Sequence, residues 1–131
     1  LGEGVTQSFK EAVKYYRLAA EQGFANAQNN LGVAYDQGDG VSKDYKEAMK
    51  WYLLAAERGN RDAPNNIGVL HMIGFGVPRS FAKAHTWFTI AGAGDSEAIS
   101  NKNFVKKRLT PEQLVESQRR ADEWQLIWLK K

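Results

Sequence analysis

Several kinds of residue and motif are missing from this chain of 131 residues, and each absence narrows its chemistry. It has no cysteine, which excludes disulfides, thiolate metal sites and a cysteine nucleophile. It has no G-x-S-x-G or H-E-x-x-H motif and no P-loop lysine, so the signatures of common hydrolases and nucleotide-binding proteins are missing. No stretch approaches the roughly 20 apolar residues of a membrane-spanning helix. We therefore expect no transmembrane segment, no metal and no cofactor.

The chain also has little excess of positive over negative charge, since its net charge is +3. Residues 1–96 contain ten Lys or Arg and ten Asp or Glu, whereas residues 97–131 contain eight basic and five acidic residues. The whole excess therefore lies in the C-terminal segment. Because so small an excess is a weak electrostatic footprint, nucleic acid is not expected as a partner.

The main positive feature of the sequence is a motif that repeats every 36 residues. The segment "GDGVSKDYKEAMKWYLLAAERGN" at 38–60 is related to the segments at 2–24 and 74–96, and residues 25–35 are related to residues 61–71. A unit of this size cannot bury its apolar face alone, so consecutive units must stack. The coincident positions include Gly2, Gly38 and Gly74; Gly4, Gly40 and Gly76; Val5, Val41 and Val77; Ala12, Ala48 and Ala84; and Ala19, Ala55 and Ala91.

Each period has the pattern of two helices. In the first half, Ala27, Leu31 and Ala34 recur at the spacing of one apolar helix face. In the second half the same spacing is kept by Tyr45, Ala48, Trp51, Tyr52 and Ala55. One aromatic position, Tyr15, Trp51 and Trp87, is predicted to form a ladder along the stack, and core packing is the expected role rather than a cofactor stack.

The predicted helix ends have local signals. Ser8 and Asp44 are each followed three residues later by a glutamate, which predicts a capping box at both positions. Ser80 keeps the cap but lacks the acid. Gly23 and Gly59 follow the second helices, where a left-handed C-terminal cap favours glycine.

Two further pairs of glycines need an explanation. Gly32 and Gly68 lie inside the first helices, where glycine costs up to ~1 kcal/mol relative to alanine, so we expect an aromatic side chain packed directly on the backbone there. Gly38 and Gly40 form a Gly-x-Gly that resembles a phosphate-binding loop. Such a loop would follow a β-strand and would not recur every 36 residues. We therefore predict a helix cap at Gly38 and a tight turn at Gly40.

Together these positions resemble the Sel1-like repeat family, which is related to the tetratricopeptide repeats. The resemblance covers about residues 1–101 and implies an all-α fold, a right-handed α/α superhelix of tetratricopeptide-like helix-turn-helix repeats. Its members usually act as protein-binding scaffolds. The third repeat departs from the pattern at His71, Ser80 and Gly92. The pattern is met at Ala27, Leu31, Gly32, Tyr35, Gly38, Gly40, Val41, Asp44, Ala48, Trp51, Tyr52, Ala55, Ala56 and Gly59.

Within this fold we expect a single repeat domain over residues 1–131. Residues 1–24 would be a partial repeat with only its second helix, residues 25–60 and 61–96 two repeats, and residues 97–131 a degenerate helix followed by a C-terminal capping helix. Repeats upstream of Leu1 are expected, because the chain begins at an inter-helix turn. A terminal helix after a basic connector is common in bacterial members of the family, which favours a bacterial source.

The last helix has its own start signal. Thr110, Pro111 and Gln113 occupy the N-cap, first and third helical positions. The helix is expected to carry Leu114, Ala121, Trp124 and Trp128 on one stripe. We predict that "WQLIWLKK" at 124–131 packs on the last repeat or self-associates, with a membrane-surface anchor as the alternative.

In tetratricopeptide-like stacks the first helix of each repeat lines a concave groove, so the resemblance places candidate partner-binding residues there. Side-chain amides and an apolar patch at Val69, Met72 and Ile73 would grip an extended or helical peptide. The Lys–Asn carboxylate clamp of some tetratricopeptide proteins is not expected, because Asn29 and Val33 occupy its positions. The candidate groove residues are Asn26, Asn29, Val33, Asp36 and Gln37, then Asp62, Asn65, Val69, Met72 and Ile73.

The predicted function is therefore a non-enzymatic protein–protein interaction scaffold that binds a protein or peptide. The alternative is a bacterial envelope scaffold that binds peptidoglycan or glycan. His71 and His85 lie on neighbouring helices of one repeat without a third ligand, so we interpret them as core or surface residues. The bacterial cytoplasm, the periplasm and secretion all stay open as compartments.

Overall fold

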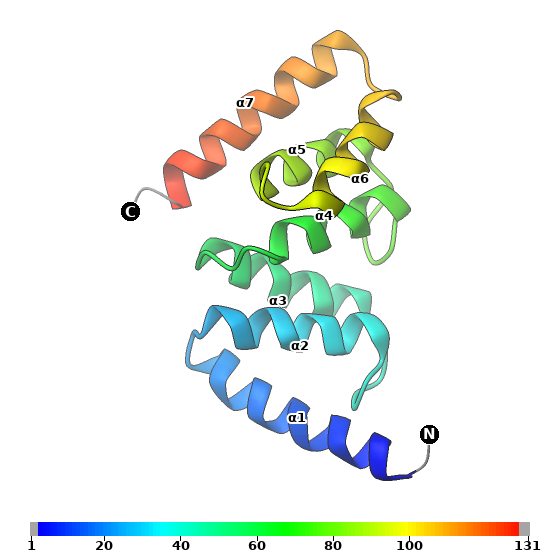
Figure 1. Ribbon diagram of the computed structural model, residues 1–131, viewed down its shortest axis with the longest axis vertical. Helices are drawn as coiled ribbons and strands as arrows, with labels where there is room; N and C mark the ends of the chain where they lie inside the picture. Colours follow the sequence, from blue (N-terminus) through cyan, green and yellow to red (C-terminus); the bar gives the residue numbers. More distant parts are fainter. Residues whose placement is uncertain (1–2, 129–131) are drawn as a thin grey trace. The chain divides into compact units, whose positions relative to one another are not determined.

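The computed structural model describes residues 3–128, with only the backbone of Glu3, Val5 and Thr6. Within these residues the chain forms helices and no strand, which confirms the all-α fold class (Figure 1). It divides into two compact units, residues 1–60 with the first three helices and residues 61–131 with the other four. The helices are α1 (Glu3–Glu21), α2 (Ala25–Gln37), α3 (Tyr45–Glu57), α4 (Ala63–Ile73), α5 (Phe81–Ala91), α6 (Ser96–Lys106) and α7 (Pro111–Trp128).

In the first unit, α2 packs against both α1 and α3 (Figure 1). Leu31 and Ala34 face the interior, as their helical spacing predicts, and meet Trp51 of α3. Val13 and Ala20 of α1 complete this buried cluster. The core is therefore built from the apolar positions that repeat along the sequence.

The predicted aromatic ladder is wrong at Tyr15, whose side chain is 73 % exposed. Trp51 is buried in the core of the first unit, and Trp87 is half-buried in the second unit. Equivalent positions differ because burial depends on which helices lie around each side chain. Among the described helices α1 packs mainly on α2, and Tyr15 lies outside that contact.

The turn predicted before the first helix is also wrong. Since α1 begins at Glu3, Ser8 lies inside the helix, and its hydroxyl donates to the carbonyl of Gly4 at 3.0 Å instead of capping. The equivalent turn before α3 is held by the preceding helix, because the amide of Asp44 donates to the carbonyl of Tyr35 at 3.0 Å. In α1 the corresponding residue, Ser8, instead lies five residues after the start of the helix. Leu1 and Gly2 lie outside the described residues.

The Gly-x-Gly at the end of α2 is a structural turn, as predicted. Gly38 has a φ of 73°, and its amide donates to the carbonyl of Ala34 at 2.8 Å. Gly40 has a φ of 77°, and a Cβ added there would lie 2.5 Å from the carbonyl oxygen of Phe9 in α1. Glycine is therefore required at Gly40 both for its backbone conformation and for its close approach to α1.

Two glycines inside helices are explained by aromatic packing, as expected. A Cβ on Gly32 would lie 2.6 Å from the ring of Tyr52, and a Cβ on Gly68 would lie 2.4 Å from the ring of Phe88. Both rings are almost fully buried. In each repeat, glycine lowers the stability of the helix, but its lack of a Cβ allows an aromatic ring to pack directly on the helix backbone.

In the second unit, α5 is central, because it packs against α4, α6 and α7. Ala84 and Phe88 of α5 form the buried cluster with Ala98 and Val105 of α6. α7 lies along α5 (Figure 1). The C-terminal helices therefore cover the same helix that carries the third copy of the repeat pattern.

Helix caps position the second helix of each complete repeat. The carboxylate of Asp44 accepts from the amide of Glu47 at 3.1 Å, and the hydroxyl of Ser80 accepts from the amide of Lys83 at 3.1 Å. The reciprocal half of the Asp44 box does not form, because the Asp44 amide donates to Tyr35 instead. Both predicted caps are confirmed, although neither is a complete box.

The start of α7 is the complete capping box that the sequence predicts. The hydroxyl of Thr110 accepts from the amide of Gln113 at 3.1 Å, and the Gln113 side chain accepts from the amide of Thr110 at 2.9 Å. Pro111 is the first residue of the helix. These interactions fix where α7 begins and hence which of its side chains face α5.

Candidate partner-binding site

The predicted groove residues of α2 are largely engaged within the first unit. Asp36 accepts a hydrogen bond from the hydroxyl of Tyr52 at 2.9 Å, and burial together with this carboxylate raises the pKa of Tyr52. Asn26 accepts from the side-chain amide of Asn60 at 2.9 Å. Of the predicted residues in this helix, Asn26 and Gln37 are exposed, Val33 and Asp36 are half-buried, and Asn29 is buried.

The predicted residues of the second unit show the same pattern. Asn65 is 4 % exposed and accepts from the side-chain amide of Asn101 at 3.3 Å. Val69 and Met72 pack partly against the core of this unit, so the predicted apolar patch is exposed mainly at Ile73. Asp62 is also exposed. The groove as a peptide-binding surface stays a prediction, with fewer accessible side chains than the sequence indicates.

A second candidate site lies between α5 and α7, within the second unit, and we call it the α5–α7 groove. It consists of two adjoining cavities of about 380 Å³ and 280 Å³, close to the size of small ligand pockets. Lys83, Thr86 and Arg120 line both cavities and form their junction. The larger cavity is completed by Ser80, Ala82, Glu112, Gln113, Glu116 and Ser117, and we call it the polar cavity because most of its lining residues are polar. The smaller is completed by Trp87, Ile90, Glu123, Trp124 and Ile127, and we call it the apolar cavity because it contains two tryptophans and two isoleucines.

Helical spacing places these side chains in rows. Lys83, Trp87 and Ile90 follow one another at intervals of four and three residues, which is one face of α5. Across the groove, the ring of Trp124 meets Trp87 edge to face, with 5.4 Å between centroids and 69° between planes. The two tryptophans thus form an apolar wall shared by both helices.

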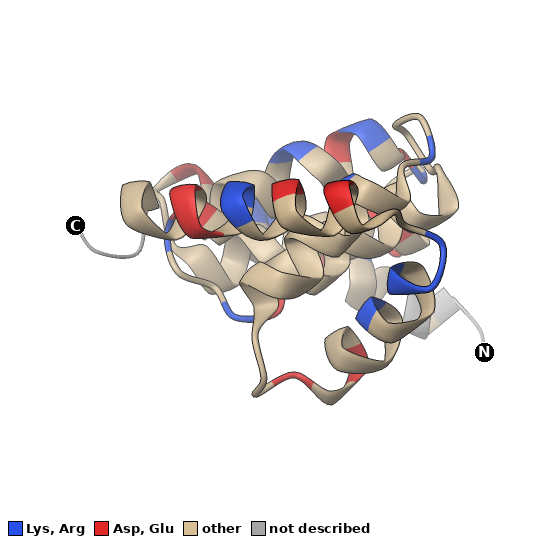
Figure 2. Cartoon of the chain, turned by 90° about the horizontal axis from the view of Figure 1, so that it is seen from above, with Lys and Arg blue, Asp and Glu red and all other residues tan. Residues whose placement is uncertain are grey.

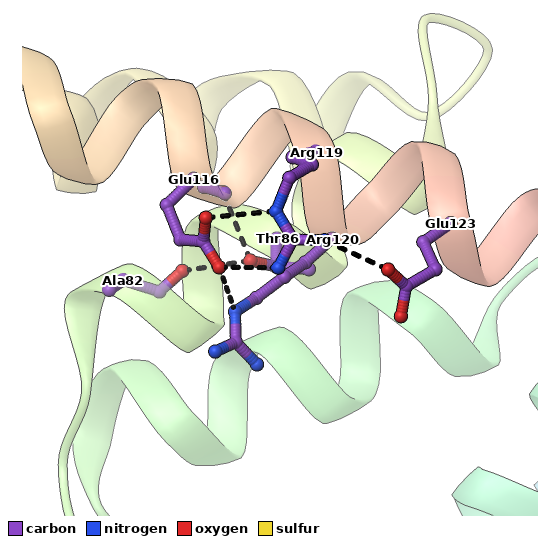
Figure 3. Close-up of polar contacts among 7 residues, drawn as sticks. Ala82, Thr86, Glu116, Arg119, Arg120 and Glu123 are labelled. Carbon is purple, nitrogen blue, oxygen red and sulfur yellow. Dashed lines mark hydrogen bonds and ion pairs between the residues drawn. The ribbon is translucent and has the colours of Figure 1, made fainter.

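Along α7, two glutamates are followed by two arginines and then by two further acids (Figure 2). Glu116 accepts from Arg119 at 2.7 Å and from the Nε of Arg120 at 2.9 Å, and Arg119 also donates to Glu123 at 2.9 Å (Figure 3). The bonds from Arg119, and then those from Arg120, lower the pKa of Glu116 to about 2. Two of the acids that line the groove are therefore already neutralised by arginines.

Lys83 differs from these residues, because its ammonium makes no ion pair within the described part of the chain. Its charge acts on His71, whose pKa is lowered mainly by burial and further by Lys83. Lys83 thus brings a positive charge, unpaired among the described residues, to the junction of the two cavities, and Arg120 brings the N–H donors that its bond to Glu116 leaves over.

A chain of buried and partly buried hydrogen bonds links α7 to α5 at the wall of the polar cavity. The Nδ1 of His85 lies 2.6 Å from the hydroxyl of Ser117, which lies 3.0 Å from the hydroxyl of Thr86, and this donates to the carbonyl of Ala82 at 3.1 Å. Because Thr86 uses its hydrogen on Ala82, Ser117 must donate to Thr86. All three contacts are satisfied when His85 carries its hydrogen on Nδ1 and donates to Ser117.

This arrangement is unsuited to nucleophilic catalysis. A histidine that donates to a serine cannot take the proton of that serine through the same nitrogen, and Ser117 is 2 % exposed. Burial lowers the pKa of His85 to about 4, with smaller contributions from Lys102 and Lys106, so the ring is neutral at pH 7. Among the described residues, no group of three or more His, Asp or Glu side chains is placed to hold a metal ion.

Of the apolar residues near the C-terminal end of α7, some pack on neighbouring side chains and others are exposed. Trp124 is half-buried between Trp87 and Trp128, which agrees with the predicted packing on the last repeat. Leu126 is 60 % exposed and Ile127 is 45 % exposed. No helix in the described range 3–128 combines the length and apolar character needed to cross a bilayer. Residues 129–131 of the predicted anchor lie outside the described residues.

The sequence patterns do not predict a groove between α5 and α7, although one residue of its lining, Trp124, belongs to the predicted C-terminal interface. Trp124 was predicted as an interface residue, whereas Lys83, Ser117 and Arg120 were not singled out. The repeat pattern cannot identify them, because α7 lies outside the repeat and its packing partner is set by tertiary structure. The spacing of Ser117, Arg120 and Trp124 along one helix face is the signal that could have revealed a lining row.

Comparison with known proteins agrees with this architecture. Residues 1–24, 25–60 and 62–96 each match the Sel1 repeat, whereas no curated protein matches the chain. The chain resembles c5321, a protective antigen of uropathogenic Escherichia coli that displays an SLR fold, with 36 % identity and a TM-score of 0.86 over 91 % of this chain and 26 % of that one. It also resembles a Sel1 repeat protein from Oxalobacter formigenes, with 38 % identity and a TM-score of 0.66 over 72 % of this chain and 40 % of that one. The chain thus spans well under half of either protein, and it belongs to the Sel1 repeat family.

Proposed function

We propose that this chain is a non-enzymatic interaction module that binds a peptide segment of a protein partner in the α5–α7 groove. Sel1 repeat proteins are generally protein-interaction scaffolds, so the family supports the general role. The observation that carries the specific proposal is the composition of the groove. An apolar wall of Trp87 and Trp124 adjoins positively charged and hydrogen-bonding side chains in one open site.

The chemistry of the site favours binding over catalysis. The one serine–histidine contact that the structure describes is buried, and Ser117 is 2 % exposed, so its hydroxyl is not accessible to a substrate. The groove does, in contrast, have the apolar surface and the hydrogen-bonding groups that bind a peptide. Apolar side chains can be buried against the tryptophans, and a backbone amide can donate to the carboxylate of Glu112.

The predicted groove on α2 and α4 stays a second region of the same function. Its accessible side chains include Gln37 and Ile73, whereas Asn29 and Asn65 are buried. Exposed residues test this region better than the buried asparagines, because replacing a buried, hydrogen-bonded amide weakens the fold as well as any binding.

The proposal is tested by selecting 12-residue peptides from a display library on the immobilised full chain and retesting each peptide by fluorescence anisotropy. Ile127→Glu places a charge in the apolar cavity and should weaken binding at least about tenfold. Leu126→Glu is the matched control, because Leu126 is the neighbouring residue, is exposed and does not line the groove. Its affinity should stay within about twofold of the parent chain.

Two outcomes would contradict this assignment. Selected peptides that lose affinity with Ile73→Glu but not with Ile127→Glu would place binding on the predicted α4 surface. Failure to select any peptide, together with sedimentation of the chain with purified peptidoglycan, would favour the glycan-binding alternative.

A further inference from the structure

We infer that the α5–α7 groove recognises the C-terminal residue of its partner, with the free α-carboxylate on Lys83 and Arg120 and a bulky apolar side chain in the apolar cavity. This inference rests on the proposed function and specifies the chemistry of the peptide. It is argued from the charges at the junction, the size of the apolar cavity and the position of the polar cavity.

The charge at the junction favours a carboxylate. Of the three acids that line the groove, Glu116 and Glu123 are already bonded to Arg119 and Arg120 (Figure 3), and Glu112 lines only the polar cavity. Arg120 uses its Nε for Glu116, and within the described residues its two terminal nitrogens donate no other hydrogen bond. Lys83 has no ion pair in the same described range. An arginine edge and a lysine ammonium on one site are donors suited to a carboxylate.

The small size of the apolar cavity indicates that the carboxylate and the apolar side chain of the bound peptide belong to the same residue. Its volume is about 280 Å³, and its lining brings Lys83 and Arg120 together with Trp87, Ile90, Trp124 and Ile127. Thr86 and Glu123 complete the lining, and Glu123 is bonded to Arg119. A ligand that fills it must present a negative charge and a large side chain within the same small space. The last residue of a chain does this, because its carboxylate and side chain branch from one Cα.

The polar cavity then receives the residues that precede the terminus. It shares Lys83, Thr86 and Arg120 with the apolar cavity, so the two spaces adjoin at the carboxylate. It is also lined by Glu112, whose carboxylate can accept from peptide amides, and by Gln113, whose side-chain oxygen already caps α7. An internal acidic residue fits less well, because the chain would have to continue in both directions past the junction.

The test uses N-acetylated six-residue peptides, Ser-Gly-Ser-Gly-Ser-Phe, titrated against the full chain by isothermal calorimetry. One peptide has a free carboxylate and one a C-terminal amide. A third has a free carboxylate but ends in Ala, and a fourth carries Asp before an amidated Phe. The free acid ending in Phe should bind about ten- to a hundredfold more tightly than its amide, since a hydrogen-bonded charge is lost in the amide. The Ala and Asp peptides should both be weaker than the free acid ending in Phe.

Variants localise the effect. Lys83→Met and Arg120→Met keep most of the apolar stem and should reduce the acid-to-amide affinity ratio to near one. Lys107→Met, a charge removal at an exposed position outside the groove, should leave the ratio unchanged. Circular dichroism confirms that each variant is folded.

The outcomes separate this inference from the proposed function. Equal affinity of acid and amide overturns the inference, and so does tighter binding of the Asp peptide. If display-selected peptides still lose affinity with Ile127→Glu, the proposed function stands despite that failure. If neither the hexapeptides nor any display peptide binds, both are overturned.

Discussion

Gly68→Ala tests the packing that builds each repeat. A Cβ at this position would lie 2.4 Å from Cε1 of Phe88, whereas ordinary contacts begin near 3.4 Å, so the ring must retreat by about 1 Å. Phe88 is 1 % exposed and packs against Ala84, Ala98 and Val105, so it cannot move without displacing its neighbours.

Two effects oppose each other in this substitution. Alanine favours the helix over glycine by up to ~1 kcal/mol. Overpacking a well-filled core costs about 1–3 kcal/mol, and an overlap with a buried ring belongs at the upper end of that range. We therefore expect a net loss of about 2 kcal/mol in the free energy of unfolding, or roughly 5–10 °C in Tm.

The assay is urea denaturation followed by far-ultraviolet circular dichroism. Gly4→Ala is the control, because Gly4 is helical and a Cβ there meets nothing within 4 Å, so this variant should be no less stable than the parent. Adding Phe88→Leu to Gly68→Ala should recover about 1 kcal/mol relative to the sum of the single changes, because the two sites are in contact. A Gly68→Ala protein as stable as the parent would refute the reasoning.

Two further predictions concern the caps and the buried histidine. Asp44→Ala should lower the free energy of unfolding by about 1 kcal/mol because it removes the cap of α3, whereas Ser8→Ala should change it by less than about 0.5 kcal/mol because Ser8 lies within α1; equal effects in thermal denaturation would contradict this pair. His85 has a pKa near 4 in the fold against 6.5 when unfolded, so its contribution is present above pH 6.5 and is lost as the pH falls to 4. Between pH 7 and pH 4 the parent should lose about 3 kcal/mol more stability than His85→Gln in urea titrations, and parallel pH profiles would argue against a buried neutral ring.

The repeat explains why so much of the fold could be predicted from the sequence. Gly32 and Gly68 at equivalent positions predict an aromatic ring on the helix backbone, and Tyr52 and Phe88 occupy those places. Such predictions from one repeat hold in the next because equivalent positions have the same residue types and pack in the same way.

The predictions from sequence are wrong at positions whose structure depends on neighbouring helices rather than on the local residue pattern. Ser8 has the same capping signal as Asp44, but α1 begins at Glu3, so Ser8 lies inside the helix and its hydroxyl donates to the carbonyl of Gly4. Tyr15 has the same position as Trp51, but its burial depends on neighbouring helices rather than on its own sequence.

The candidate site was the least predictable part for a related reason. The predicted residues Asp36 and Asn65 are polar and lie on the expected helices, yet they bond to Tyr52 and Asn101 within their own units. Sequence spacing shows which residues share a helix face, but it does not show which of them are used internally. The α5–α7 groove depends on where a helix outside the repeat docks, and no periodicity records that choice.

The most direct test of the central claim is a map of backbone amide chemical shifts in the ¹⁵N-labelled full chain during titration with the free-acid hexapeptide that ends in Phe. We predict that the largest changes fall in residues 83–90 and 116–127, the segments of α5 and α7 that line the groove, and that the amidated peptide produces much smaller ones. Changes confined to α1, α2 and α3, or identical changes with acid and amide, would contradict a C-terminal peptide site between α5 and α7.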